Sequence, residues 1–252
     1  MNQKFTCTIL GIASKLSYLK EIGITGTWLS PIFDSPRVDN GYDISDYRKV
    51  HTDYGTIDDF KALVTKCKEI GIKLILDFVP NHTSDKHEWF IKSALKDPDY
   101  INYYVWEDPI ILGDGTRKEP TNWLSEFRYS SWEWHAGRQQ YYLHQFAKAQ
   151  PDLNYREPKV VEEMKEVLRY WLDLGVDGFR IDAVPYLFEK AKNSLGKYDD
   201  EPLSNNANCP DPTRACYLNH IYTQNQPETF DMAYQWRAVL DEYRRAHNTD
   251  VK

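Results

Sequence analysis

The chain repeats one pattern three times: a helical stretch, a glycine and a strongly β-forming apolar run. The copies end in EIGITGTWLSPIF (residues 21–33), EIGIKLILDFVP (69–80) and DLGVDGFRIDAV (173–184). Such near-continuous apolar strands are typical of a parallel sheet that is covered on both faces. Helix followed by buried strand, repeated, therefore predicts the βα units of a doubly wound sheet or of a (β/α)₈ barrel.

Local signals mark the ends of the helices. Thr56, with Asp59 three residues on, matches a capping box, and Pro158 suits a first helical turn. A glycine follows each helix, at the position where the chain commonly turns left-handed: Gly23, Gly71 and Gly175. These signals agree with the periodicity, so we predict a helix before each of the three strands.

The long irregular segments all follow the predicted strands. They cover residues 34–55, 82–155 and 185–228. In parallel α/β folds, active sites gather at the carboxyl ends of the strands. Asp77 and Asp182 stand at two such ends, so we expect both on the functional side of the sheet.

Arg180 and Asp182 lie two residues apart inside the third apolar run. Residues i and i+2 of a strand point to the same face, and a neighbouring cation favours the ionised form of a carboxyl group. We therefore expect Arg180 to keep Asp182 charged. Taken alone, the pair is as consistent with a structural ion pair as with a catalytic group.

Charge and hydropathy exclude some classes of function. The net charge of −7 over 252 residues, without any basic block, argues against a nucleic-acid partner. No apolar run approaches the roughly 20 residues that would span a bilayer. The start, MNQKFTCTILGIAS, faintly resembles a signal peptide, but its apolar stretch runs directly into a helical pattern.

The cysteines indicate the cellular compartment in which the protein is found. Cys209 and Cys216 lie in a loop rich in Asn and Pro, so we predict a short disulfide ring between them. Cys67 lies in a helical pattern and is expected to be a buried thiol, and no His and Cys spacing suggests zinc. Persistent disulfides belong to secreted or surface proteins, so a secreted or cell-surface location is expected.

Four motifs occur together: DNGYDISDY (39–47), DFVPNHTS (77–84), QPDLNY (150–155) and GFRIDAV (178–184). In this order and spacing the chain resembles glycoside hydrolase family 13, the α-amylase family. Within it, the α-glucosidases, oligo-1,6-glucosidases and insect maltase-like proteins are the most similar.

The resemblance implies an α/β fold, a partial (β/α)₈ TIM barrel with an irregular domain inserted after the third barrel strand. Residues 1–81 would begin the barrel, residues 82–155 would form the inserted domain, and residues 156–252 would continue the barrel.

The same resemblance implies a retaining α-glucosidase, in which two carboxyl groups stand about 5–5.5 Å apart across the scissile bond. Asp182 matches the nucleophile, and Arg180 supplies the charge that keeps it ionised. The other matching positions would bind the oligosaccharide: a glucose clamp of Asp39, Tyr42 and His82, an aromatic wall at Phe146, and Asp77, which organises the loops.

Ala183 follows the nucleophile directly. In this branch of the family, a small residue at this position resembles enzymes that prefer α-1,4 links, and valine resembles those that prefer α-1,6 links. One methyl-sized difference discriminates by roughly 1–3 kcal/mol. The sequence therefore favours maltose-like or sucrose-like substrates.

A calcium site is also implied by similarity to insect relatives. Its oxygen donors would be the side chains of Asn81, Asp152 and Glu189 and the carbonyls of Tyr186 and Leu187, a set suited to this hard cation. Asn81 also heads an Asn-His-Thr glycosylation sequon, and a glycan there would exclude the calcium role.

The sequence departs from the family at both ends. MNQKFTCTIL matches neither the first barrel strand nor the loop that follows it, and nothing matches the glutamate general acid or the later His-Asp pair. We therefore expect a fragment, poorly soluble and inactive on its own.

The alternative to an enzyme is a non-catalytic relative, either a maltase-like surface receptor or a transporter heavy chain. Retention of the matching site residues favours the enzyme, and a transporter heavy chain should carry a membrane span.

Overall fold

The computed structural model describes residues 8–249, which form two compact units. The sheet unit comprises the described parts of Met1–Val79, Glu163–Asp182 and Tyr234–Lys252. The aromatic unit comprises Pro80–Glu162 and Ala183–Ala233. The signal-peptide-like start falls largely on residues 1–7, which lie outside the described residues.

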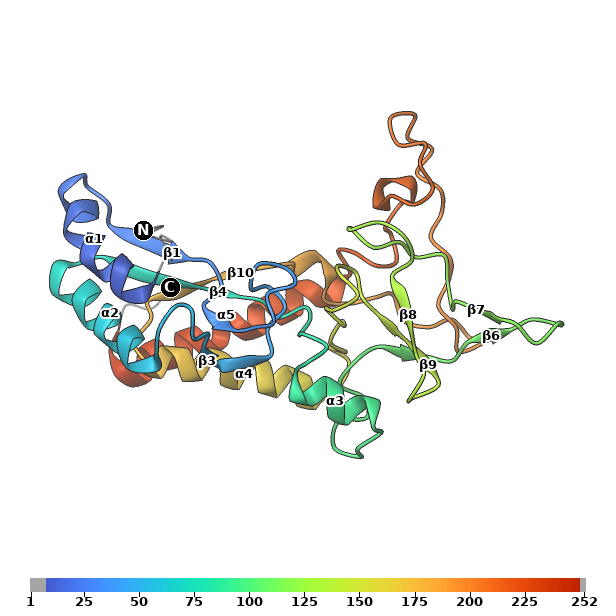
Figure 1. The fold of residues 1–252 in the computed structure, drawn as a ribbon, viewed down its shortest axis with the longest axis horizontal. Coiled ribbons are helices and arrows are strands. Elements are labelled where there is room, and N and C mark those ends of the chain that lie inside the picture. The colour runs from blue at the N-terminus through green and yellow to red at the C-terminus, as the bar shows by residue number, and fades with distance from the viewer. Residues whose placement is uncertain (1–7, 250–252) are drawn as a thin grey trace, which may run out of the picture. The chain divides into compact units, whose positions relative to one another are not determined.

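A parallel sheet of three strands forms the centre of the sheet unit (Figure 1). Its strands are β1 (Gly26–Leu29), β4 (Lys73–Phe78) and β10 (Gly178–Ile181), with β4 in the middle. The three apolar runs therefore form parallel, hydrogen-bonded neighbours, as predicted. A short antiparallel pair, β2 (Phe33–Asp34) with β3 (Asp46–Val50), accompanies the sheet.

Helices precede the three strands, as the sequence predicts: α1 (Ile9–Glu21), α2 (Ile57–Ile70) and α4 (Pro158–Asp173). The Thr56 side chain accepts from the backbone of Asp59, whose side chain accepts in return, so the capping box is confirmed. Gly71 ends α2 with φ 68°, the left-handed conformation that glycine adopts without steric cost. A last helix, α5 (Pro227–His247), has its portion from Tyr234 onward in the sheet unit.

The core of the sheet unit is aromatic. The Trp171 ring packs 5.3 Å from Phe33 and 5.0 Å from Phe60, and its indole N–H donates to the Tyr47 carbonyl at 2.8 Å. Phe78, at the end of β4, packs edge-on against Trp236 of α5. Burying each such ring contributes on the order of 2–3 kcal/mol. The Phe78–Trp236 contact thus packs α5 against the end of β4, next to Asp77.

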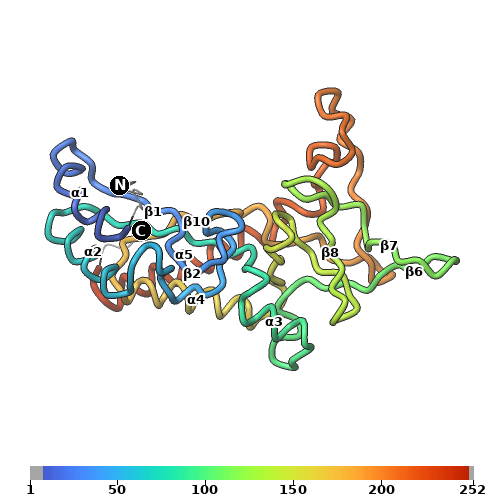
Figure 2. Tube along the Cα trace, viewed as in Figure 1, coloured from blue at the N-terminus to red at the C-terminus, as the bar shows by residue number. Residues whose placement is uncertain are grey.

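The aromatic unit contains short elements joined by irregular chain, traced in Figure 2. One sheet has the order β5-β9-β8, and a separate hairpin pairs β6 with β7. The elements are α3 (Glu88–Ala94), β5 (Trp106–Glu107), β6 (Ile110–Ile111), β7 (Arg117–Lys118), β8 (Trp132–His135), β9 (Gln140–Leu143), and the 3₁₀ turns η1 (Val184–Tyr186) and η2 (Ala215–Tyr217).

Residues 183–233 belong to the aromatic unit together with residues 80–162, whereas the sequence predicts that residues 156–252 continue the barrel. The physical reason is a set of long-range contacts that sequence does not reveal. The Trp123 ring lies 4.9 Å from Tyr198, and its indole N–H donates to the Asp199 carbonyl at 3.0 Å. The Asn122 side chain donates to the Glu201 carbonyl at 2.9 Å.

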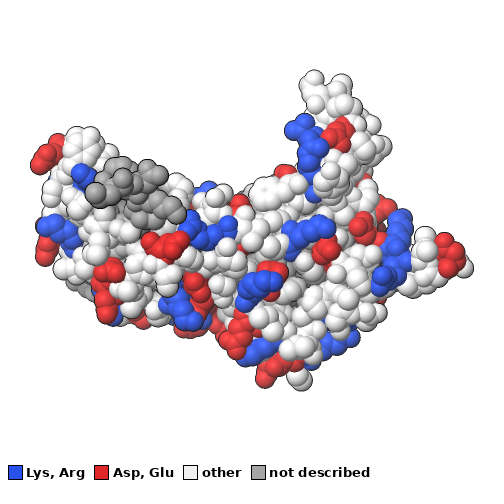
Figure 3. Space-filling model, viewed as in Figure 1, with Lys and Arg blue, Asp and Glu red and all other residues white. Residues whose placement is uncertain are grey.

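The distribution of charges on the surface agrees with the lack of a basic block in the sequence. On the face drawn in Figure 3, acidic and basic side chains are interspersed among the described residues. Between residues 8 and 249, no helix is both long enough and apolar enough to cross a membrane.

Candidate functional site

A cluster of charged groups lies at the carboxyl ends of β4 and β10. Register places Arg180 opposite Asp77, and Asp182 follows β10 directly, with its backbone N–H donating to the Phe78 carbonyl at 2.8 Å. The Arg180 guanidinium donates through Nη1 to Asp182 Oδ1 at 2.5 Å and to both oxygens of Asp77, at 3.2 and 3.3 Å. One cation therefore bridges two carboxylates.

Asp77 is the buried partner of the bridge. Its side chain is fully buried, whereas 43% of the Arg180 side chain and 21% of the Asp182 side chain remain exposed. Burial raises the pKa of Asp77 above its usual range, even though Arg180 acts in the opposite direction. The sequence predicts the pairing of Arg180 with Asp182 but not this sharing, which depends on the register between strands.

Tyr42 extends the cluster. Its hydroxyl donates to Asp77 Oδ2 at 3.1 Å. Burial raises the pKa of Tyr42 to about 12, and the negative charge of Asp77 acts in the same direction. The hydroxyl therefore stays protonated at physiological pH and remains a hydrogen-bond donor.

Asp43 organises the loop that carries Asp39 and Tyr42. Its fully buried carboxylate accepts from the Ser35 hydroxyl at 3.0 Å and from the backbone N–H groups of Val38 and Asp39, at 2.9 and 3.0 Å. Sequence reasoning missed this role. A signal exists in the motif itself, because an Asp within a turn commonly accepts from nearby backbone N–H groups.

Trp28 is a second residue that sequence reasoning missed. It pairs with Ile75 in the β1–β4 register, two residues before Asp77, so its side chain faces the same side as Asp77. The Arg180 guanidinium lies 5.2 Å from the Trp28 ring centroid, a cation–π distance. The periodicity of β1 could have identified this contact once the strand order was known.

The aromatic unit holds the other predicted sugar-binding residues. The buried His82 ring lies 5.1 Å from Phe146, and Phe146 lies 4.9 Å from Tyr186 and 6.0 Å from Phe127. We call these four rings the aromatic row. His82 Nε2 also lies 3.1 Å from Gln150 Nε2, and His82 Nδ1 lies 3.3 Å from Asn81 Nδ2. The sequence predicts Phe146 as an aromatic wall and His82 as a hydrogen-bonding residue, but it does not predict the ring contacts of Tyr186 and Phe127.

Two buried carboxylates stand among the predicted calcium donors. Burial raises the pKa of Asp152 to about 7 and that of Glu189 to about 8, and the Asp152 charge further raises the latter. Glu189 Oε1 is buried without a hydrogen-bond partner. Gln145 Nε2 donates to Asp152 Oδ2 at 2.8 Å and to the Tyr186 carbonyl at 2.9 Å. A cation would neutralise the two buried carboxylates and supply a partner for Glu189 Oε1.

These residues therefore fit a hard cation, which prefers carboxylate, amide and carbonyl oxygens. Among residues 8–249 there is no group of three or more His, Cys, Asp or Glu side chains with metal-binding geometry, so the fit depends on amide and carbonyl oxygens as well. Leu187, the remaining predicted donor, directly follows η1. Asn81 and Thr83 are buried in the fold, which argues against a glycan on this sequon.

Ala183 adopts the left-handed conformation, with φ 51° and ψ 29°. This conformation costs a non-glycine residue roughly 1 kcal/mol and is still less favourable for a β-branched side chain. The left-handed backbone at position 183 therefore disfavours a β-branched residue there. This adds to the substrate preference that the sequence predicts for a small residue.

The predicted site residues thus lie in two groups, each within its own unit. Asp39, Tyr42, Asp77, Arg180 and Asp182 belong to the sheet unit, and Tyr42, Asp77, Arg180 and Asp182 are in direct contact. The remainder belong to the aromatic unit: Asn81, His82, Phe146, Asp152, Ala183, Tyr186, Leu187, Glu189, and the cysteines Cys209 and Cys216, which form the predicted disulfide.

Comparison with known proteins gives a consistent result. The family model described as "Alpha amylase, catalytic domain" matches residues 2–250. Maltase A1 of Drosophila melanogaster is 60% identical over 96% of this chain and 42% of its own length. The salivary alpha-glucosidase of Aedes aegypti is 59% identical over 94% of this chain and 41% of its own. The chain thus spans about two fifths of these relatives.

Solved structures show the same likeness. An alpha-glucosyl transfer enzyme superposes with a TM-score of 0.84 at 38% identity, covering 94% of this chain and 44% of that chain. The trehalose-6-phosphate hydrolase of Bacillus licheniformis superposes with a TM-score of 0.78 at 35% identity, covering 93% and 39%.

Proposed function

The chain belongs to the family of α-amylase catalytic domains, and on this basis we propose that its protein is a retaining α-glucosidase. It would release terminal α-linked glucose from maltose-type or sucrose-type oligosaccharides. The observation that carries the proposal is the bridge in which Arg180 contacts both Asp182 and Asp77 at neighbouring strand ends. Such a bridge holds one carboxylate charged and oriented while leaving it partly exposed.

Asp182 is the nucleophile in this proposal. Arg180 contacts its Oδ1, which leaves Oδ2 to attack the anomeric carbon. The glycosyl–enzyme ester forms as the glycosidic C–O bond breaks, and the leaving oxygen takes a proton from the general acid. Asp77 orients the guanidinium from the buried side. Asp39 hydrogen-bonds to sugar hydroxyl groups and Tyr42 offers its ring face, in the roles that the family resemblance gives them.

The general acid belongs to another part of the family's catalytic domain. Asp77 is the other carboxyl group in the cluster, but its oxygens already accept hydrogen bonds from Arg180 and Tyr42. An oxygen that accepts in this way has no proton to give to a leaving group. We therefore expect residues 1–252 alone to hydrolyse no α-glucoside.

In the aromatic unit, the aromatic row offers ring faces to sugar, and His82 offers a hydrogen bond. Ala183 keeps the backbone turn beside the nucleophile free of a bulky side chain. A calcium ion, held by Asn81, Asp152, Glu189 and the carbonyls of Tyr186 and Leu187, would stabilise this unit by neutralising its buried carboxylates. The disulfide supports a secreted or cell-surface location, because such bonds persist in oxidising compartments.

The test uses the full-length protein that contains this chain. Asp182→Asn is compared with Asp58→Asn, which removes an exposed carboxylate from α2, using maltose and p-nitrophenyl α-glucoside. We expect Asp182→Asn to lower kcat by at least about 10³-fold and Asp58→Asn to leave it unchanged. An inactive wild-type protein that still binds glucosides would favour the alternative, a non-catalytic receptor, and would refute the proposal.

A further inference from the structure

The turn at residues 125–130 has an unfavourable backbone. Arg128 and Tyr129 are consecutive non-glycine residues with φ 79° and φ 63°. Each costs of order 1 kcal/mol, so the surrounding structure must hold the turn in place. Within the turn, the Ser125 N–H donates to the Tyr129 carbonyl at 2.9 Å, and the Arg128 N–H donates to the Ser125 carbonyl at 3.0 Å. These local bonds fix the shape of the turn. Its first half is also anchored, because the Ser125 hydroxyl donates to the Phe146 carbonyl at 2.7 Å and the Glu126 N–H donates to the Gln145 carbonyl at 2.9 Å, whereas neither bond involves Arg128 or Tyr129.

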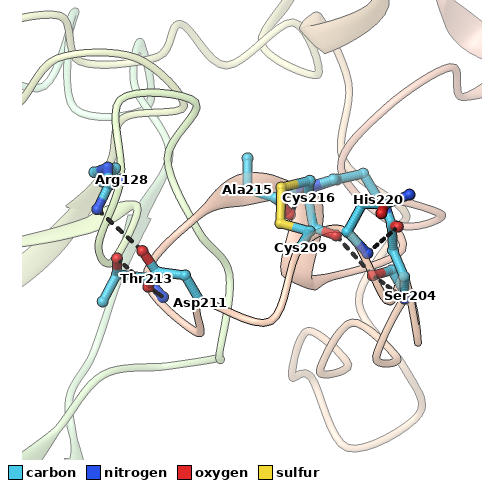
Figure 4. Close-up of a disulfide and its surroundings, with 10 residues drawn as sticks. Arg128, Ser204, Cys209, Asp211, Thr213, Ala215, Cys216 and His220 are labelled. Carbon is cyan, nitrogen blue, oxygen red and sulfur yellow. Dashed lines mark hydrogen bonds and ion pairs between the residues drawn. A yellow bond between two sulfur atoms is a disulfide. The ribbon is translucent and has the colours of Figure 1, made fainter.

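The ring closed by Cys209 and Cys216 holds the turn from outside. Arg128 Nη1 lies 3.1 Å from Asp211 Oδ2, and the Tyr129 N–H donates to the Thr213 carbonyl at 2.7 Å. Asp211 and Thr213 both lie inside the ring of residues 209–216. Figure 4 shows Arg128 reaching from its own segment to Asp211 beside the disulfide. Both outside contacts of the strained residues therefore depend on one covalent loop.

The ring is itself rigid and anchored. Asp211 Oδ1 accepts from the Thr213 N–H at 3.0 Å and from its hydroxyl at 2.7 Å, which fixes the carboxylate that faces Arg128. On the other side, the Ser204 hydroxyl donates to the Cys216 carbonyl at 2.6 Å (Figure 4). Cys209 is buried, whereas Cys216 is exposed and open to a reductant.

The turn carries two side chains that reach the aromatic row. The Phe127 ring lies 6.0 Å from Phe146. Glu126 Oε1 accepts from the Tyr186 hydroxyl at 2.9 Å and from Gln224 Nε2 at 3.0 Å. A displacement of the second half of the turn therefore moves Phe127, at the outer end of the row, while Glu126 stays bonded to Gln145 and Tyr186.

We propose that the Cys209–Cys216 ring is a positioning device for the sugar-binding aromatic row, with Arg128 as the positioning residue through which it acts. The expected effect on sugar binding rests on the proposed function, whereas the expected movement of the turn does not. Opening the ring lets Arg128 and Tyr129 relax toward ordinary backbone angles and moves Phe127 away from Phe146. Sugar binding then weakens, while Asp182 and Arg180 stay unchanged.

The mechanics are tested by hydrogen exchange of the full-length protein, with site resolution at Tyr129 and Glu126. A Cys209→Ser/Cys216→Ser variant, and wild type treated with a dithiol that reduces the disulfide to two thiols, are compared with untreated wild type. We expect the Tyr129 amide to exchange at least about tenfold faster in both. The Glu126 amide, which donates to the Gln145 carbonyl, should be unchanged. Equal protection of Tyr129 with the ring open would overturn the proposal.

The consequence is tested by kinetics. We expect the ring-open variant and Arg128→Ala to raise KM for maltose about three- to tenfold, the range that one aromatic contact is worth, with kcat within about twofold. Arg128→Lys should restore most of the loss, because it keeps the charge facing Asp211. Arg169→Ala, which removes an exposed ion pair with Glu166, is the matched control.

A double-mutant cycle separates positioning from general stability. In a Phe127→Ala background, opening the ring should add little further change in KM. Additive effects, or an equal fall in kcat, would overturn the proposal. A wild-type protein without α-glucoside turnover would defeat the proposed function, and the exchange experiment would still decide whether the ring positions the turn.

Discussion

Removing the Arg180 guanidinium tests the electrostatics of the charged cluster. In Arg180→Gln, the buried carboxylate of Asp77 loses the only cation that contacts it among the described residues. Breaking a fully buried ion pair typically costs about 3–5 kcal/mol. Because 43% of the Arg180 side chain is exposed, water screens part of that interaction, and we expect a loss of about 2–3 kcal/mol at pH 8.

The loss should depend on pH with a definite sign. Burial already raises the pKa of Asp77, and removal of Arg180, which opposes that shift, raises it further. A carboxyl group with a raised pKa binds its proton more tightly in the folded state, so stability falls as pH rises from the unfolded pKa, near 4, through the folded one. The variant should therefore be nearly as stable as wild type at pH 4 and clearly weaker at pH 8.

The assay is urea unfolding of the full-length protein followed by tryptophan fluorescence at several pH values. Asp77→Asn in the same background removes the buried charge and should recover most of the loss. Arg169→Gln, at an exposed ion pair, should change stability by less than about 0.5 kcal/mol. A loss in Arg180→Gln that is independent of pH, or that persists with Asp77→Asn, would show that the buried charge of Asp77 is not its cause.

Three further predictions concern other parts of the chain. Ala183→Val should destabilise the protein by about 1–2 kcal/mol in thermal unfolding, because a β-branched residue is strained at φ 51°, whereas Ala183→Gly should not. Chelation by EDTA should lower the melting temperature of wild type, and Glu189→Gln should reduce that shift; an unaffected wild type would remove the case for calcium. Burial raises the pKa of the Cys67 thiol to about 11, so in a Cys7→Ser background iodoacetamide should label Cys67 only on unfolding.

Local sequence signals were sufficient to predict most elements of the sheet unit. The capping box of Thr56 and Asp59, the glycine at position 71 and the apolar runs all act within a few residues, and the structure confirms them. The disulfide between Cys209 and Cys216 is also close in sequence, with a separation of seven residues. Such features depend on neighbours along the chain, which a sequence displays directly.

Features that depend on pairing between distant segments could not be predicted in this way. The sharing of Arg180 between Asp182 and Asp77 follows from the β4–β10 register, which joins residues about a hundred positions apart. The packing of Tyr198 on Trp123 has the same character. A sequence pattern specifies which residues face a sheet, but not which strand lies beside which.

The strained backbone angles could not be predicted from the sequence either. Ala183, Arg128 and Tyr129 adopt left-handed angles although none is a glycine or an asparagine, the residues that usually signal this conformation. Tertiary contacts impose these angles, and no local preference predicts them. The two strained places lie beside the proposed nucleophile and beside the aromatic row, where sequence reasoning had named single residues but not the backbone that positions them.

In the proposed mechanism, Asp182 forms a covalent bond with glucose. The most direct measurement treats the full-length protein with a fluorinated α-glucosyl fluoride, which accumulates the glycosyl–enzyme, and maps the modified residue by peptide mass spectrometry. We expect one fluoroglucosyl group on the peptide that contains Asp182, released slowly as the free sugar. Modification of another carboxylate such as Asp77, or turnover of substrate without any covalent adduct, would contradict it.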